Sequence, residues 1–283
     1  MKTFWRQTGK LYRLSILSLL FFLLLAIVAP FAAPYNPDAV SMHEILQPST
    51  TAHLLGTDAL GRDILSRLIY GTRISVSFAA ASALCTMLLG VTLGMVGGYF
   101  GGWIDKAIQF MTTMVQGLPG MSLMVAIAAI MPEGNFRLIV AVTLTSWAGI
   151  SRIVRSEVLR IKKENYMEGI RCIGGSTLYI LRKYVYPNVL PVILMLLTLR
   201  IGRSLLSASA LSYLGLGVTP PTADWGVMIN DARTYFRSFP LQIIAPGLAI
   251  TLFCISINLV GDAWREYIGR DRAVDWERRQ GNG

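Results

Sequence analysis

The sequence predicts an all-α, polytopic membrane protein with about six transmembrane helices. Hydrophobic residues make up 53% of its 283 residues and charged residues only 15%, whereas a typical soluble domain carries about 25% charged residues. The apolar residues also gather in runs of the length that a helix needs to cross a bilayer, about 20 residues. The same apolar content excludes a disordered or collagen-like chain.

Six apolar runs are long enough to be membrane spans. In chain order they are residues 15–33, 74–97, 107–130, 138–153, 189–214 and 241–261. The apolar part of the first run is longer than that of a cleaved signal peptide, about 7–15 residues, so we favour a retained anchor over a leader that is removed. Within the third run, Gly117 to Gly120 encloses a proline and predicts a kink. Glycines recur every fourth residue at 90, 94, 98 and 102 and predict close helix packing.

The distribution of charge predicts the orientation of these spans. Residues 1–14 contain four basic residues (Lys2, Arg6, Lys10 and Arg13) and no acid, which is typical of a cytoplasmic flank. With six spans, residues 34–73 are then extracytoplasmic, while the loop 154–188 and the tail 262–283 are cytoplasmic. The segments assigned inside hold 18 basic and 9 acidic residues, against 6 and 7 outside. The net charge of +10 therefore records topology. It does not indicate nucleic-acid binding, because no stretch is both soluble and long enough to form such a module.

The expected domain organisation follows from this topology. A cytoplasmic N-terminus (1–14) and a first anchor (15–33) precede the extracytoplasmic segment (34–73). The main transmembrane domain covers 74–261 and contains the loop 154–188, and the cytoplasmic tail is 262–283.

The loop 154–188 carries the clearest amphipathic pattern. Residues 158–173 are expected to form a helix with apolar side chains on one face, at Tyr166, Ile170 and Ile173. Gly174 can end that helix, and Ser176 can cap a second one that runs to Pro187. Such helices suit docking to a partner protein or lying on anionic lipid, and the residue pattern favours neither.

This loop resembles the EAA loop of ABC-transporter permeases. In that pattern EAA is followed by three residues, a glycine and a later Leu-Pro; here the corresponding residues are Glu168, Gly169, Ile170, Gly174 and Leu190–Pro191. Both alanines of the pattern are replaced. In the family the loop forms coupling helices that sit in a cleft of the cytoplasmic ATPase. The resemblance therefore implies an ATPase-coupling role for Glu168, Gly169, Ile170 and Gly174.

Residues 55–73 match in full the motif LGTDxxGRDxxSRLxxGxR. The segment resembles C-type permease subunits of the dipeptide/oligopeptide/nickel ABC importer family, the binding-protein-dependent transport system inner membrane components. Its motif residues are Gly56, Thr57, Asp58, Gly61, Arg62, Asp63 and Arg67. We expect Asp58 to cap the following helix, and Arg62, Asp63 and Arg67 to pair with one another at helical spacing. A strap that fixes the second span is favoured over direct contact with substrate.

Residues 212–233 resemble a second motif of this family, LSFLGLGVxPPTxxWG. The segment is expected to contact a substrate-delivering binding protein or to anchor the chain at the outer interface. Trp225 and Tyr235 suit the belt of aromatic residues at the membrane surface.

The resemblance implies a permease subunit that forms half of the pathway of an ATP-driven importer in the bacterial inner membrane. Its partners would be a second permease subunit, giving a heterodimer, two cytoplasmic ABC ATPase subunits, an extracytoplasmic solute-binding protein and membrane lipid. The ATP-binding pattern GxxxxGK[ST] is absent from the sequence. We therefore expect a non-catalytic subunit that binds no cofactor, with ATP and Mg²⁺ on the partner ATPases.

Two arginines, Arg200 and Arg203, lie one turn apart within the fifth expected span. A charge at the centre of a bilayer costs about 2.5–3.5 kcal/mol on insertion scales and must face protein, water or the interface. With Ser204 and Ser207 they form a candidate translocation path, or they pair with an acid of the second permease subunit; both interpretations stay open. Many family members have a glutamate where this chain has Ala208.

The transported solute is less constrained. Residues 224–233 and 240–242 resemble nickel permeases of the family more than dipeptide permeases. Two arginines in the path disfavour a bare cation, and no cluster of His, Cys or acid lies in a span as a metal site would need. Nickel carried as a chelate reconciles these observations, with di- or oligopeptides as the alternative.

Two other classes of membrane protein fit the sequence less well. A secondary transporter driven by an ion gradient usually has inverted repeats and intramembrane acids. A membrane enzyme needs a catalytic constellation, but the two histidines, His43 and His53, share one loop without an HExxH or GxSxG motif.

Overall fold

The computed structural model describes residues 10–280, and the side chains of these except residues 135, 171 and 267–280. Residues 1–9 of the expected N-terminal flank, including Lys2 and Arg6, lie outside the described residues, as do residues 281–283 of the tail.

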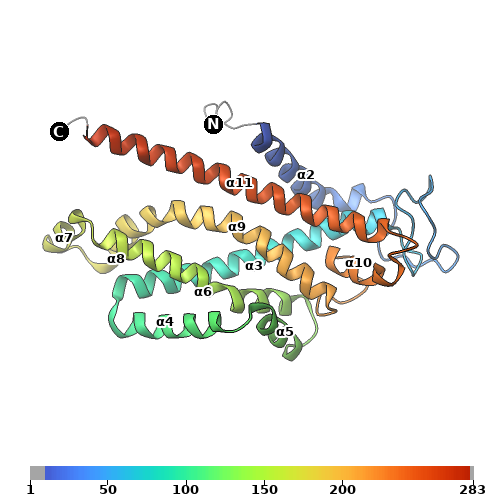
Figure 1. The fold of residues 1–283 in the computed structure, drawn as a ribbon, viewed down its shortest axis with the longest axis horizontal. Coiled ribbons are helices and arrows are strands. Elements are labelled where there is room, and N and C mark those ends of the chain that lie inside the picture. The colour runs from blue at the N-terminus through green and yellow to red at the C-terminus, as the bar shows by residue number, and fades with distance from the viewer. Residues whose placement is uncertain (1–9, 281–283) are drawn as a thin grey trace.

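Five long helices run along the molecule (Figure 1). The long helices are α2 (Lys10–Ala32), α3 (Ile64–Phe100), α6 (Asn135–Lys162), α9 (Tyr186–Tyr213) and α11 (Leu241–Gln280). The shorter ones are α4 (Gly102–Gly117), α5 (Gly120–Ile130), α7 (Asn165–Cys172), α8 (Thr177–Ile180) and α10 (Trp225–Ala232). Of the shorter helices, α7 and α8 lie at one end and α10 toward the other, whereas α4 and α5 lie alongside α6 (Figure 1). Within residues 10–280, five helices are long and apolar enough to cross a membrane, or six if α4 and α5 form one broken span. The predicted all-α polytopic fold is confirmed.

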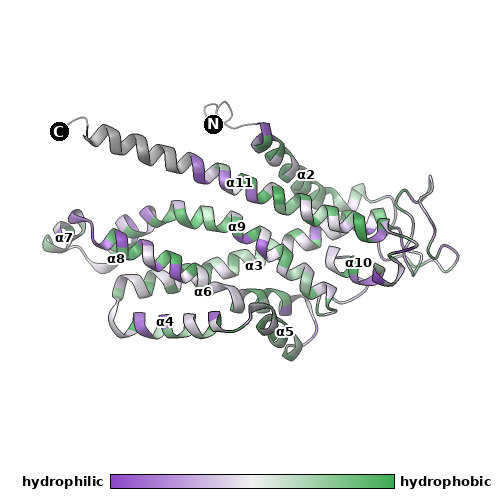
Figure 2. Ribbon diagram, viewed as in Figure 1, coloured by the Kyte–Doolittle hydropathy of each residue, from purple (hydrophilic) through white to green (hydrophobic). Residues whose placement is uncertain are grey.

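Hydrophilic residues gather at the two ends of the bundle (Figure 2). One end carries α7 and α8. The other carries α10 and the segment between α2 and α3. The middle of the long helices is mostly apolar, as a helix in contact with lipid requires.

The third expected span is two helices. α4 and α5 meet at an angle of 94°, so the prediction of a single span over 107–130 is wrong, although the predicted break lies at the right place. Leu118 is extended (φ −93°, ψ 145°) because the ring of Pro119 disfavours helical geometry in the residue before it.

Several other helices are longer than the apolar runs predicted. α3 begins ten residues before the expected span, because Asp63 caps it: a carboxylate oxygen of Asp63 accepts from the backbone N–H of Ser66. α6 continues to Lys162, and α11 continues through the expected tail boundary to Gln280. Hydropathy alone places span ends where the apolar residues stop, whereas a helix continues until its backbone is capped.

The loop between α6 and α9 differs from its predicted outline. The helix expected over 158–173 is interrupted after Lys162, and α7 begins at Asn165. The hydroxyl of Ser176 caps α8 as predicted, accepting from the N–H of Tyr179. The helix does not end at Pro187, however. A π-helical turn, Leu181–Val185, links α8 to α9, so the chain is helical through Pro187, which stands in the first turn of α9, where its missing N–H is tolerated.

α3 and α6 pack closely along the predicted glycine stripe. A Cβ atom on Gly90, Gly94 or Gly98 would lie 2.6–2.9 Å from the nearest atom of α6. Gly102, the fourth member, starts α4, and a Cβ there would meet nothing within 4 Å, so three of the four glycines serve this contact. Val154 and Val158 of α6 are fully buried beside them.

Candidate functional site

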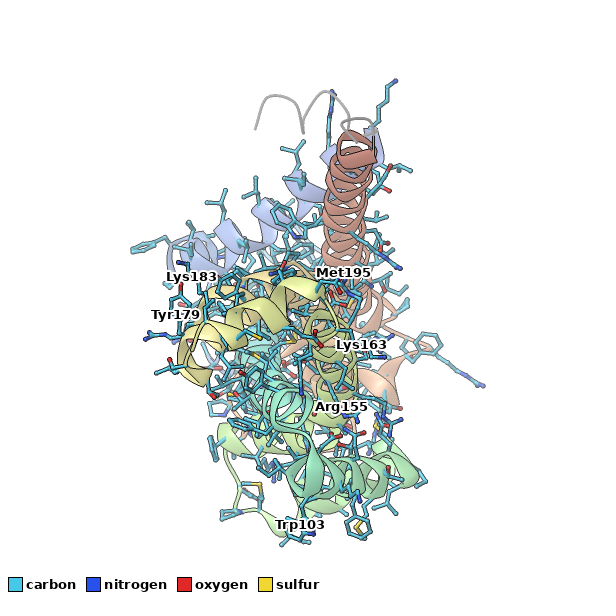
Figure 3. All side chains as sticks on the ribbon, turned by 90° about the vertical axis from the view of Figure 1, so that its left-hand side faces the viewer. Trp103, Arg155, Lys163, Tyr179, Lys183 and Met195 are labelled. Carbon is cyan, nitrogen blue, oxygen red and sulfur yellow. The ribbon has the colours of Figure 1, made fainter. Side chains whose placement is uncertain are left out.

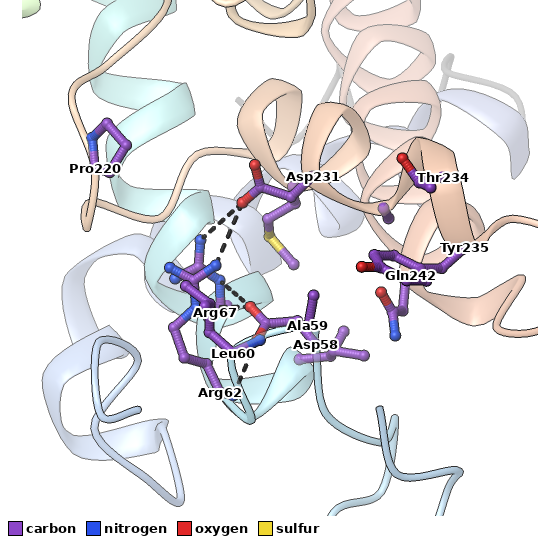
Figure 4. A pocket seen from close by; sticks show the side chains of 13 residues that line it. Asp58, Ala59, Leu60, Arg62, Arg67, Pro220, Asp231, Thr234, Tyr235 and Gln242 are labelled. Carbon is purple, nitrogen blue, oxygen red and sulfur yellow. Dashed lines mark hydrogen bonds and ion pairs between the residues drawn. The ribbon is translucent and has the colours of Figure 1, made fainter. Parts of the chain in front are cut away.

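Four charged side chains meet at the end of the bundle that carries α10 (Figure 4). The Nε atom of Arg62 lies 2.7 Å from the Oδ2 atom of Asp58, and its Nη2 atom lies 3.3 Å from Oδ2 of Asp231. Arg67 lies 3.6 Å from the same oxygen of Asp58 and 3.9 Å from that of Asp231. The group lines a cavity of about 340 Å³. It joins the segment before α3 to α10.

Local backbone geometry brings Asp58 to this position. Gly56 and Gly61 have φ of +81° and +71°, and the backbone carbonyls of Gln47 and Ser41 stand where a Cβ would be; only glycine fits both constraints. Between them, Asp58 accepts hydrogen bonds from the backbone N–H groups of Leu60 and Arg62. The motif residues therefore form a tight turn against the preceding segment.

Two predicted roles within this motif are wrong. The cap of α3 is Asp63, and Asp58 instead stabilises the turn before it. The two arginines pair with Asp58 and Asp231 rather than with Asp63, because Asp63 already accepts from Ser66 and contacts Nδ1 of His53 at 2.9 Å.

Sequence reasoning missed two partners of the motif residues: His53, which contacts Asp63, and Asp231, which contacts the two arginines. His53 lies ten residues before Asp63, and Asp231 lies far along the chain from both arginines. Asp231 lies near the end of α10, and no local pattern in the sequence identifies it as the partner of arginines before and in α3. Burial raises the pKa of Asp231 above its usual range, and the charges of Arg62 and Arg67 oppose that shift.

Charged side chains of the 55–73 motif are deeply buried. Arg67 is 2% exposed and Asp63 3%, and Arg67 also donates to the carbonyls of Pro37 and Pro221. Through these contacts the buried side chains join the segment 34–63 to the bundle. Trp225 was expected at the membrane surface but is fully buried, with its indole N–H donating to the carbonyl of Leu68.

A second candidate region lies between α6 and α9, where Arg200 and Arg203 line a cavity of about 270 Å³. The other residues around it are Ser146, Gly149, Ile150, Ile153, Leu196 and Leu199. Of the other predicted path residues, Ser204 is fully buried and Ser207 half-buried. Neither lines this cavity, so the structure brings together only the two arginines of the four predicted residues.

The third candidate region is the loop at the opposite end of the bundle (Figure 3). Glu168 and Gly169 are exposed on α7, whereas Ile170 is half-buried against a core that includes the fully buried Met167. Gly174 has φ of +81°, a conformation that favours glycine and that lets the chain turn sharply between α7 and α8.

Large apolar side chains project from this loop. Ile173 is 85% exposed and Leu178 63% exposed; neither was among the predicted coupling residues. The amphipathic pattern included Ile173 but could not distinguish the inward Ile170 from the outward Ile173, because the helix ends between them at Cys172. Tyr179 and Lys183, which Figure 3 shows on this loop, are joined by a hydrogen bond of 2.9 Å.

Comparison with known proteins matches residues 90–274 to a family described as binding-protein-dependent transport system inner membrane component. The chain is 37% identical to the glutathione transport system permease protein GsiD of Pectobacterium atrosepticum, over 94% of this chain and 89% of that protein. It is 37% identical to the nickel transport system permease protein NikC of Escherichia coli K12, over 90% and 92%. It is 36% identical to the dipeptide transport system permease protein DppC of Bacillus subtilis, over 93% and 83%.

Proposed function

Since the chain belongs to the family of binding-protein-dependent transport system inner membrane components and is a transmembrane permease subunit of an ABC importer, we propose that it forms half of a translocation pathway for nickel, carried as a chelate, or for a small peptide. The observation that carries this proposal is the arginine cavity in the middle of an otherwise apolar bundle. A polar site at that depth is expected on a solute path.

The proposed assembly contains a second permease subunit, two cytoplasmic ATPases and an extracytoplasmic solute-binding protein. This chain is its non-catalytic part, and ATP and Mg²⁺ act on the ATPases. Both termini and the loop 154–188 are cytoplasmic, whereas the segment 34–73 and α10 are extracytoplasmic. The opposite placement of α7 and α10 in the bundle supports this orientation (Figure 1), as does the excess of basic residues in the segments assigned inside.

In the loop between α6 and α9, we assign the ATPase contact to α7 and the turn after it. Glu168 and Gly169 are exposed there, and Ile173 adds an apolar side chain that the described residues leave largely uncovered. Gly174 lets α7 and α8 diverge, and Ile170 fixes α7 to the core. An exposed apolar side chain next to a helix that is fixed to the core is typical of a docking contact.

The importance of Ile173 for docking can be tested directly. Ile173→Ser should reduce the amount of ATPase that co-purifies with the permease by about tenfold, the usual effect of removing a central apolar contact. Val40→Ser removes a similarly apolar, exposed side chain from the segment between α2 and α3 and should leave ATPase recovery unchanged. Equal recovery with the two variants would show that Ile173 does not contact the ATPase.

The transported solute can be identified through the solute-binding protein. Relatives named for glutathione, nickel and dipeptide transport have nearly the same identity to this chain, so identity does not choose among them. Calorimetry of the binding protein with nickel, nickel–histidine and a dipeptide is the direct test. A response to the dipeptide without any response to the two nickel probes would eliminate nickel.

Uptake by the complex reconstituted in liposomes tests the source of energy. Disabling the catalytic site of the partner ATPases should abolish uptake. Uptake that persists and follows an ion gradient would instead identify a secondary transporter.

A further inference from the structure

The two arginines of α9 lie in the middle part of that helix. Arg200 is near the middle of the helix Tyr186–Tyr213, about 20 Å from either end at a rise of 1.5 Å per residue. Arginines near helix ends can extend their charge to the membrane surface, but one at this depth must be met by protein, water or solute.

Neither arginine has a partner among the described residues. The Nε and Nη2 atoms of Arg200 are buried and make no hydrogen bond. Arg203, one turn further, is exposed and forms no ion pair or hydrogen bond of its own within the described residues. The remaining residues around their cavity are serine, glycine, isoleucine and leucine, so the lining supplies no carboxylate.

The same chain provides partners for its other buried or half-buried arginines. Arg155 makes two hydrogen bonds of 2.5 Å to the carboxylate of Asp105. Arg137 donates to the carbonyl of Gly217 at 2.9 Å, and Arg62 and Arg67 share the carboxylates described above. The exception at Arg200 therefore indicates a site whose counter-ion comes from outside the described residues, because an unpaired guanidinium is costly to bury. Arg203 adds a second positive charge to the same cavity.

We propose that Arg200 and Arg203 form an anion site that binds a carboxylate of the transported solute, an inference that rests on the proposed function. The planar guanidinium matches a carboxylate with two parallel hydrogen bonds, and the hydroxyl of Ser146 lines the same space. The cavity of about 270 Å³ is slightly below the usual size for a whole small molecule, about 300–1,000 Å³. It suits the carboxylate end of a peptide or of a metal chelate, and two positive charges repel a bare divalent cation.

A carboxylate of the second permease subunit is the competing source of negative charge. It would neutralise both arginines in the assembled complex and close the site to solute. The two sources differ in a measurable property: a site kept for solute attracts small anions, whereas a neutralised pair does not.

The test uses the assembled complex with its native cysteines replaced by serine. A single cysteine is introduced at the cavity (Ser146→Cys) or, as a control, in the exposed segment between α2 and α3 (Ala52→Cys). The rates of reaction with anionic sulfonatoethyl methanethiosulfonate and with its cationic trimethylammonium analogue are compared at both positions.

We expect the anionic-to-cationic rate ratio at Ser146→Cys to exceed that at Ala52→Cys by at least about tenfold, the lower range of electrostatic steering in a charged cleft. Adding Arg200→Gln and Arg203→Gln should remove the difference. Equal ratios at the two positions, or a Ser146→Cys thiol that reacts with neither reagent, would overturn the proposal. So would loss of the second permease subunit from Arg200→Gln complexes, because the arginine would then hold the subunits together.

Uptake provides an independent measurement. With alanyl-alanine or nickel–histidine as the probe, Arg200→Gln should lower uptake by about 10- to 100-fold, whereas Arg200→Lys should retain more of it because the charge remains. Undiminished uptake by Arg200→Gln would contradict the solute site. Failure of the proposed function can be distinguished from failure of the anion site. If the protein were not an ABC-importer subunit, uptake would not depend on the partner ATPases, whatever the ratio of anionic to cationic labelling rates.

Discussion

Arg67→Gln is expected to lower the free energy of unfolding by about 3 kcal/mol. Removing one partner of a buried ion pair usually costs about 3–5 kcal/mol, and the lower figure applies because Arg62 still contacts both Asp58 and Asp231. The substitution also removes the guanidinium hydrogen bond to the carbonyl of Pro37, a buried residue, and the one to the carbonyl of Pro221. Thermal unfolding of the purified permease in detergent measures the effect.

The consequence of this change should be confined to one end of the molecule. The segment 34–63 should become sensitive to protease, because Arg67 of α3 holds it through the carbonyl of Pro37 and the carboxylate of Asp58, while α7 and α8 at the other end stay protected. Arg73→Gln is the matched control: Arg73 is on the same helix but exposed, so its loss should change stability by no more than about 0.5 kcal/mol. Equal stability of the Arg67 and Arg73 variants would refute a structural role for the ion pairs.

Gly94→Leu is expected to separate α3 from α6 and to destabilise the protein by about 1–3 kcal/mol or more. A Cβ at Gly94 would lie 2.6 Å from the carbonyl oxygen of Ser151 and 2.9 Å from Cβ of Val154. The carbonyl oxygen of Ser151 is a backbone atom, so it can move away only if α6 shifts as a whole. The same measurement of thermal unfolding applies, and Gly94→Ala should show a smaller effect of the same sign.

Gly247 offers a matched control for this substitution. It also lies inside a long helix, but a Cβ there would meet nothing within 4 Å. Gly247→Ala should therefore be neutral or should stabilise the protein by about 0.4–1 kcal/mol, because alanine restricts the unfolded chain. If Gly94→Ala and Gly247→Ala behaved alike, close approach of α3 and α6 would not explain the glycine stripe.

Displacing α6 should also disturb function, because α6 carries residues of two candidate regions. Ile150 and Ile153 line the arginine cavity, and α6 leads directly into the loop that contains α7. A Gly94 variant that remains assembled should therefore show reduced uptake together with reduced stability. Arg200→Gln, in contrast, should reduce uptake without changing stability to a similar extent.

Much of the architecture follows from local properties of the sequence. Apolar runs located the spans, and the full 55–73 motif indicated the family. Gly174 and Ser176 were identified as the end of one helix and the start of the next, and both hold in the structure. These features depend on residues within a few positions of one another, which is the range that hydropathy, capping and turn preferences cover.

Errors arose where several local solutions compete. Asp58 and Asp63 are both acidic residues before the same helix, and either can cap it by type. The positive-φ glycines on both sides of Asp58 commit it to a turn, which leaves Asp63 as the cap. Likewise, Pro187 alone predicts the end of a helix. In the structure a π-helical turn precedes it and continues into α9, so that Pro187 lies in the first turn of that helix.

The sequence by itself determined a polytopic α-helical permease of a known importer family, with its helix-ending and turn-forming residues. Only the tertiary structure decided which charges meet: Arg62 and Arg67 find Asp231 from a distant part of the chain, whereas Arg200 and Arg203 find no counter-ion among the described residues. The physical reason is range. Helix formation and membrane insertion depend on neighbours in sequence, but an ion pair forms only between side chains that packing of the whole bundle brings within a few ångströms.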